Sequence, residues 1–120
     1  MLGRMRTIVI DADEAIRDAL LCAREESFLW ELSQSLQARF PDSSISECDA
    51  AARQSAAALL KNSWVQVFST TWAEQSSGTV LSQAEAAAAL EEPRNWRIPS
   101  TNQDPCFHLL ITDAGLEQPF

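Results

Sequence analysis

The sequence predicts an α/β domain in which helices cover a short, mainly parallel β-sheet, giving a three-layer sandwich. Two apolar runs, residues 8–10 and 107–112, have the composition of strands buried on both faces of a sheet, and each run stops at an aspartate. Between them lie stretches whose apolar residues recur every three to four positions, as on the buried face of a helix. Strands separated by helical segments favour a parallel sheet.

The size and composition of the chain predict a single domain over residues 1–120. With 120 residues, of which 46% are hydrophobic, the chain can bury one modest core. Seventeen acidic and nine basic residues give a formal net charge of −8, which opposes direct binding to nucleic acid. No apolar run reaches membrane-spanning length. We therefore expect neither a nucleic acid nor a membrane as partner.

The three cysteines indicate a cytoplasmic protein. Cys22, Cys48 and Cys106 are odd in number, widely spaced and set in apolar or strand-like surroundings. This pattern favours reduced, buried thiols over a disulfide framework or a zinc site. Residues 1–6 lack the apolar stretch of a secretory signal, and we interpret them as a short basic lead-in to the first strand.

After the first strand, the first half of the chain predicts helix, a weak strand and a second helical region. Apolar spacing predicts helix over residues 15–40, and residues 24–27 leave open whether this is one helix or two. Residues 44–48 alternate like a short strand. Asp49 then suits the N-cap of an alanine-rich helix over residues 50–62.

The second half of the chain is harder to interpret. Residues 64–68 alternate like a strand, which is the favoured interpretation, although they also continue a helical stripe. Ser82 and Glu85 have the spacing of a capping box, which predicts a helix that ends before Pro93. Residues 94–105 carry two prolines and predict a surface loop.

Three aspartates are the candidate site residues. Asp11 and Asp113 each follow a predicted strand, and neighbouring parallel strands bring their carboxyl ends to one edge of the sheet. Asp13, two residues beyond Asp11, can point the same way or can cap the following helix. Clustered carboxylates suit Mg²⁺, a hard cation that takes oxygen ligands. We expect no cofactor other than Mg²⁺, for which these residues offer ligands.

Three segments, in this order, resemble the receiver domain of bacterial response regulators. Residues 8–17 resemble its first strand and acidic loop, and residues 32–62 the end of its first helix, its second strand and its second helix. Residues 107–116 resemble the third strand with the phosphoacceptor. The resemblance covers roughly half of the chain and implies a flavodoxin-like sheet of strand order 2-1-3, with an insertion over residues 63–106.

By position, the resemblance implies that Asp113 is the phosphoacceptor. It also implies a metal site formed by Asp11, Asp13, Asp113 and the carbonyl of Gly115. The chain departs from the family at Ala12, which stands where a second adjacent acid belongs, so that Asp13 would substitute from a shifted position.

The switch residues of the family also lack counterparts. Seven residues follow Asp113, which leaves no room for the two later strands that supply a hydroxyl residue and a lysine. The single lysine, Lys61, lies on a predicted helix. We therefore expect that Asp113 is not phosphorylated.

The favoured hypothesis is a signalling or regulatory module, not an enzyme, that binds a protein partner or a second copy of itself. One alternative is a Mg²⁺-dependent phosphoacceptor, or an enzyme resembling haloacid-dehalogenase-type phosphatases, that uses Asp11, Asp13 and Asp113. Another is a small acidic inhibitor or immunity-type protein that masks a basic partner, which the net charge suggests.

Aromatic residues bear on the protein-binding hypothesis. We expect the four tryptophans in the core or at its hydrophobic rim, and an exposed one would mark a partner surface. We expect the single histidine, His108, to be a packed residue of its apolar strand and not a ligand. The tryptophans are Trp30, Trp64, Trp72 and Trp96.

Overall fold

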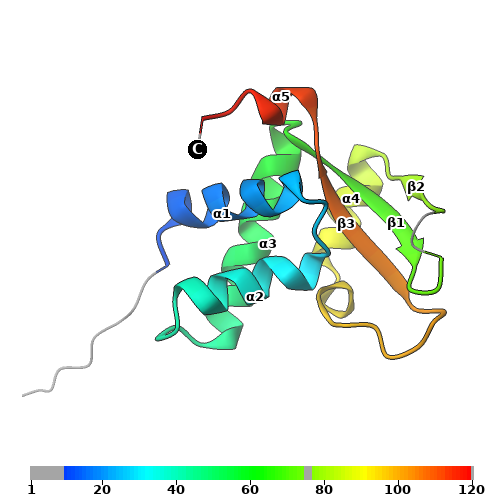
Figure 1. Cartoon of the computed structure of the whole chain (residues 1–120), viewed down its shortest axis with the longest axis horizontal. Coiled ribbons are helices and arrows are strands. Elements are labelled where there is room, and N and C mark those ends of the chain that lie inside the picture. Colours follow the sequence, from blue (N-terminus) through cyan, green and yellow to red (C-terminus); the bar gives the residue numbers. More distant parts are fainter. Residues whose placement is uncertain (1–9, 75–76, 120) are drawn as a thin grey trace, which may run out of the picture.

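The computed structural model describes residues 10–74 and 77–119, in which helices surround a small antiparallel sheet (Figure 1). The elements in chain order are α1 (Ala12–Arg24), α2 (Leu29–Arg39), α3 (Ile45–Lys61), β1 (Val65–Thr71), β2 (Thr79–Val80), α4 (Gln83–Glu91), the 3₁₀ turn η1 (Pro93–Trp96), β3 (Pro105–Ile111) and α5 (Asp113–Leu116).

The sheet has the strand order β2–β1–β3, and both pairs of neighbouring strands are antiparallel. β1 pairs with β3 over its whole length, from Val65 opposite Ile111 to Thr71 opposite Pro105. β2 pairs with β1 over two residues. Beyond the β3 edge, Phe28 forms an isolated antiparallel bridge with β3. Four separate parts of the chain therefore meet at the sheet.

The expected mainly parallel, flavodoxin-like sandwich of order 2-1-3 is wrong, because both ladders of the sheet are antiparallel. Residues 63–106, expected as an insertion, supply the central strand β1 together with β2 and α4. An apolar run looks the same in sequence whichever way its neighbour runs, so the run at residues 107–112 gave no sign of its antiparallel partner.

Two other strands were expected, over residues 8–10 and 44–48. Of the strand expected over residues 8–10, residues 8 and 9 lie outside the described part of the chain, and Ile10 directly precedes the cap of α1. Residues 44–48 form the beginning of α3, not a strand. Ser44 caps that helix, and its hydroxyl accepts the backbone N–H of Glu47 at 3.0 Å.

Two helix predictions are resolved by the structure. The region over residues 15–40 consists of two helices, α1 and α2, and the break between them contains Glu26 at a positive φ of 58°. The capping box that was expected before α4 is confirmed. The Ser82 hydroxyl accepts the backbone N–H of Glu85 at 3.2 Å, and the Glu85 carboxylate accepts that of Ser82 at 3.0 Å.

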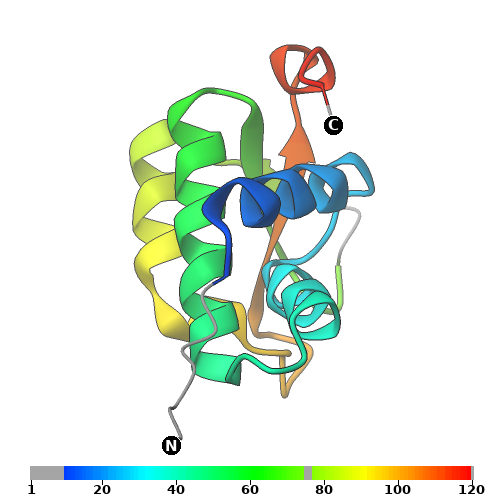
Figure 2. The same cartoon turned by 90° about the vertical axis from the view of Figure 1, so that its left-hand side faces the viewer.

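One face of the sheet packs against the helices. In both views α3 and α4 run side by side along the same side of β1 and β3, and α1 crosses α3 (Figures 1 and 2). From the sheet, Val65, Val67 and Leu109 are fully buried in the core. Burying each such side chain stabilises the fold by about 1.5–3 kcal/mol. The helices contribute the large core residues Leu29, Leu32, Leu36 and Leu59.

The cysteines are free thiols. Cys48 and Cys106 are buried and Cys22 is half-buried, and burial raises the pKa of all three thiols. Such thiols carry little thiolate at neutral pH and behave as small apolar side chains.

No helix in the described part of the chain has both the length and the apolar character needed to span a membrane.

Candidate functional site

The three candidate aspartates lie at helix starts. Asp11 is the N-cap of α1, and its carboxylate accepts the backbone N–H of Glu14 at 2.9 Å. The capping role that was considered for Asp13 therefore belongs to Asp11, whereas Asp13 is exposed in the first turn of the same helix. Asp113 is exposed at the start of α5.

The described residues contain no group of three or more His, Cys, Asp or Glu side chains that could hold a metal ion. Asp11, Asp13 and Asp113 therefore do not form such a group. Gly115, the fourth expected ligand, is buried against the chain, and a Cβ there would lie 2.2 Å from the carbonyl oxygen of Trp64. Its own carbonyl accepts the N–H of Gln118 at 3.1 Å. Close backbone packing explains this glycine.

A row of side chains crosses the sheet on the face that points away from the core. Residues directly opposite one another on antiparallel strands place their side chains on the same face. Val80 lies opposite Phe68, Phe68 opposite His108, and His108 opposite Phe28. With neighbouring strands about 4.8 Å apart, these four positions span about 14 Å.

Burial along the strands shows that this face is not part of the core. Within the described residues, the core cluster takes no side chain from the opposite-facing strand positions, although Thr70 and Cys106 at one end of this face are buried. The remaining opposite-facing positions are Gln66, Phe68, His108 and Leu110. Gln66 is exposed and the other three are half-buried. Val80, at the end of the row, is 46% exposed. We call this surface the open sheet face.

Aromatic rings on and beside the open sheet face contact one another, and we call them the aromatic cluster. Its members are Phe28, Trp30, Phe68, Trp72 and His108. Phe28 stacks on Trp30, with ring centroids 4.3 Å apart and planes 9° from parallel. Trp72 is tilted against both rings, at 5.6 and 5.8 Å. His108 meets Phe28 and Phe68 edge to face at 4.1 and 5.9 Å. All five side chains are half-buried, so their ring surfaces are partly accessible to a partner.

His108 has an unusual environment. Its Nε2 atom is buried and has no hydrogen-bond partner among the residues that the structure describes, and burial lowers the pKa of the imidazole. The carboxylates of Glu26 and Glu31 oppose this shift, because a nearby negative charge favours the protonated ring. Neutral imidazole is thus the favoured form at neutral pH, and it leaves the cluster apolar.

Acidic groups lie beside the aromatic cluster. The Glu31 carboxylate accepts the backbone N–H of Phe28 at 2.7 Å, which fixes the carboxylate next to the stacked rings. Glu26 is exposed in the turn immediately before Phe28. Aromatic faces and carboxylates both attract cations, so the arrangement is suited to cationic side chains.

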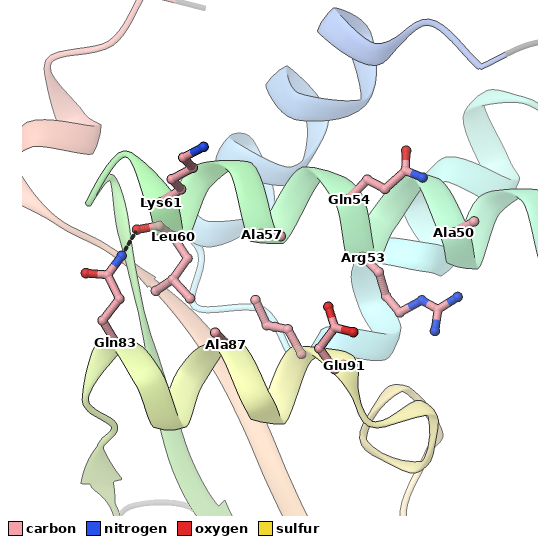
Figure 3. Close-up of a pocket in the computed structure, with 10 residues that line it drawn as sticks. Ala50, Arg53, Gln54, Ala57, Leu60, Lys61, Gln83, Ala87 and Glu91 are labelled. Atoms are coloured by element: carbon pink, nitrogen blue, oxygen red, sulfur yellow. Dashed lines mark hydrogen bonds between the residues drawn. The ribbon is translucent and has the colours of Figure 1, made fainter.

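A second surface feature is a groove between α3 and α4 (Figure 3), with a cavity volume of about 530 Å³. This helix groove has an apolar floor of Leu60 and Leu90 with alanines from both helices, which are Ala50, Ala57 and Ala87. Its polar lining residues are Arg53, Gln54, Lys61, Gln83 and Glu91.

The two helices that form the groove are tied together at one end. The side-chain amide of Gln83, at the start of α4, donates to the carbonyl oxygen of Leu60 near the end of α3 at 2.9 Å. At the other end Arg53 from α3 and Glu91 from α4 both project into the space between the helices, whereas Gln54 and Lys61 project from the rim of α3 away from α4 (Figure 3). The helices are therefore antiparallel neighbours.

No protein-family model, no curated protein and no solved structure matches this chain.

Part of the aromatic cluster has a signal in the sequence. Phe68 and Trp72 are four positions apart, which places both on one side of an extended chain. Phe28 and Trp30 lie at the start of α2, where the period of a strand does not apply. The tryptophans divide as follows: Trp96 is buried and its Nε1–H donates to the Leu90 carbonyl at 2.9 Å, Trp64 packs against the core, and the other two lie in the aromatic cluster.

Proposed function

We propose that this protein is a binding module that docks a basic segment of a protein partner on its open sheet face. The observation that carries the proposal is the aromatic cluster, which lies outside the core on a sheet face and has Glu26 and Glu31 beside it. Clusters of half-buried aromatic side chains are enriched at protein interfaces. The favoured ligand groups are arginine and lysine, because they stack on aromatic faces and pair with carboxylates.

The net charge of the chain supports the same choice of partner. A formal charge of −8 steers cationic partners toward the protein and repels acidic ones. The proposal retains the regulatory protein-binding role expected from the sequence and uses neither Asp113 nor a metal ion. The free thiols suit a reducing compartment, so we place the protein in the cytoplasm.

The test is a titration with a short peptide of alternating arginine and glycine, followed by tryptophan fluorescence. We expect binding that perturbs the emission of Trp30 and Trp72 and weakens as salt is added. Replacing either tryptophan by leucine keeps an apolar side chain but removes a cation–π partner. Each replacement should weaken binding about two- to fivefold, the equivalent of about 0.5–1 kcal/mol.

Charge variants provide the control. Glu26→Gln should weaken binding of the arginine peptide, whereas Glu14→Gln, which removes the same charge from the first turn of α1, should have a smaller effect. A glutamate–glycine peptide should not bind. Equal binding of the two peptides, or affinity unchanged in Trp30→Leu and Trp72→Leu, would contradict the proposal.

A further inference from the structure

The helix groove concentrates positive charge on an acidic protein. Arg53 and Lys61 both lie on its α3 side, and neither forms an ion pair with another described residue. Glu91 is the one acidic residue that lines the groove. Lys61 is the last residue of α3 and lies beside the N-terminal end of α4, so the opposite partial charges of the two helix ends offset one another. Glu91 lies at the opposite end of the groove, which leaves the Lys61 end the more electropositive of the two.

The shape of the groove is elongated along α3. Arg53 and Lys61 are eight residues apart, which corresponds to about 12 Å along a helix axis. Arg53 also lines an adjoining cavity of about 230 Å³ with Ser46, Asp49, Pro93 and Trp96, so an acidic residue lies at that end of the depression. The depression thus follows α3 from Lys61 to Ser46, about 22 Å at 1.5 Å per residue. That length suits about four turns of helix.

Small side chains allow close approach of another backbone. Ala57 on α3 and Ala87 on α4 are both exposed and line the groove, so a docking helix meets little steric resistance there. Leu60 and Leu90 provide the apolar floor of the groove. An amphipathic helix binds such a surface through apolar residues at three- and four-residue spacing.

We propose that the helix groove is a second docking site, which takes an acidic amphipathic helix of a partner protein. Two acidic residues about two turns apart on one flank of the partner helix pair with Arg53 and Lys61, and its apolar stripe covers Leu60 and Leu90. This site uses α3 and α4 and attracts negative charge, whereas the proposed function uses the open sheet face and attracts positive charge. The two proposals therefore fail independently.

The test uses a synthetic helical peptide with a leucine stripe and two glutamates spaced to match Arg53 and Lys61. A counterpart with lysine in place of both glutamates is the control peptide. We expect the acidic peptide to bind at least about tenfold more tightly than its counterpart in a fluorescence-anisotropy titration. Amide chemical-shift changes should map to α3 and α4.

Variants of the protein test whether the acidic peptide binds in the helix groove. Ala57→Trp fills the groove from an exposed helix position and should reduce the affinity for the acidic peptide about tenfold or more. The double variant Arg53→Glu/Lys61→Glu should reverse the preference between the two peptides. Arg17→Glu, a charge reversal on α1, should keep the preference for the acidic peptide. All variants should retain binding of the arginine–glycine peptide.

Three results with the helical peptides would overturn the inference. They are equal affinity for the two helical peptides, affinity that Ala57→Trp leaves unchanged in a folded variant, and chemical-shift changes outside α3 and α4. Laurate serves as a further probe, because a small amphipathic carboxylate could use the same cations. Binding of laurate in the groove without binding of the acidic helix would assign the site to a small molecule and would also overturn the inference.

Discussion

The open sheet face and the helix groove differ in both shape and charge. The open sheet face carries large aromatic side chains, which come from the strands and from the start of α2 and have carboxylates beside them. The helix groove is built from alanines that leave a hollow of about 530 Å³, and its rim carries Arg53 and Lys61. One surface offers projecting rings to cations, and the other offers a recess to an acidic helix.

The difference shows that net charge alone describes this protein poorly. A charge of −8 predicts basic partners everywhere, yet the groove concentrates two of the nine basic residues of the chain within about 12 Å. Local geometry therefore decides which partner each surface accepts. The two surfaces share one core, so damage to the core should disable both, whereas local changes should disable only one.

The largest expected effect distinguishes the two faces of β3. Leu109 is fully buried on the core face, whereas its neighbour Leu110 is half-buried on the open sheet face. Leu109→Ala should lower the free energy of unfolding by about 2–5 kcal/mol. Leu110→Ala should cost about half of that or less, because less apolar area is lost. Urea denaturation measures both, and equal losses would contradict the assignment of the faces.

A substitution at Gly78 should disturb the open sheet face next to Phe68. A Cβ at this position would lie 2.2 Å from the Ser69 carbonyl oxygen and 2.8 Å from Cζ of Phe68. Because the first neighbour is backbone, Gly78→Ala should destabilise the protein by about 1–3 kcal/mol through overpacking. Thermal unfolding provides the measurement, and an unchanged Tm would show that the close approach does not exist.

A substitution at Ser82 should instead affect the helix groove, through α4. Ser82 caps α4, which forms one wall of the groove, through its hydroxyl bond to the Glu85 backbone. Ser82→Ala should cost about 1 kcal/mol, the usual value of an N-cap. Ser46→Ala, in the first turn of α3 but not at a cap, is the matched control and should be close to neutral. Equal Tm values for the two variants would argue against the cap.

The smallest expected effect is a pH dependence at the aromatic cluster. Burial holds the pKa of His108 below its ordinary value of 6.5, so the unfolded chain binds this proton more readily than the folded one. The contribution of neutral His108 to stability is therefore fully present above pH 6.5 and decreases as the pH falls below it. Urea midpoints between about pH 7.5 and 5.5 should show this decrease in the wild type.

His108→Gln supplies the control, because His108 is the only histidine in the chain. The variant should lose less stability than the wild type over the same range. A wild type that instead gains stability relative to the variant at lower pH would mean that Glu26 and Glu31 outweigh burial.

The sequence predicted local structure better than the arrangement of the strands. The α4 capping box and the strand expected at residues 64–68 are confirmed, because turn chemistry and period-2 alternation are local signals. Ser44 and Glu47 have the same capping-box spacing, which could have shown that residues 44–48 begin a helix. The period-2 alternation of these residues is therefore a weaker signal than their cap.

The strand pairing and both binding surfaces depend on contacts between distant residues. Phe28 and His108 are 80 positions apart in the sequence and meet only because the α1–α2 connection runs along β3. The aspartate that follows each apolar run suggested a shared site at one sheet edge. Asp11 instead caps α1 and Asp113 begins α5, which are local roles that the same residue type fulfils equally well.

The most direct test of the account is one set of amide chemical-shift spectra, recorded with the arginine–glycine peptide and then with the acidic helical peptide. The account predicts two separate sets of perturbed residues. The basic peptide should shift Phe28, Phe68, His108 and their neighbours, and the acidic helix should shift residues of α3 and α4. Overlapping sets would show that one surface accepts both charges and would contradict the central claim, as would the absence of shifts on the open sheet face.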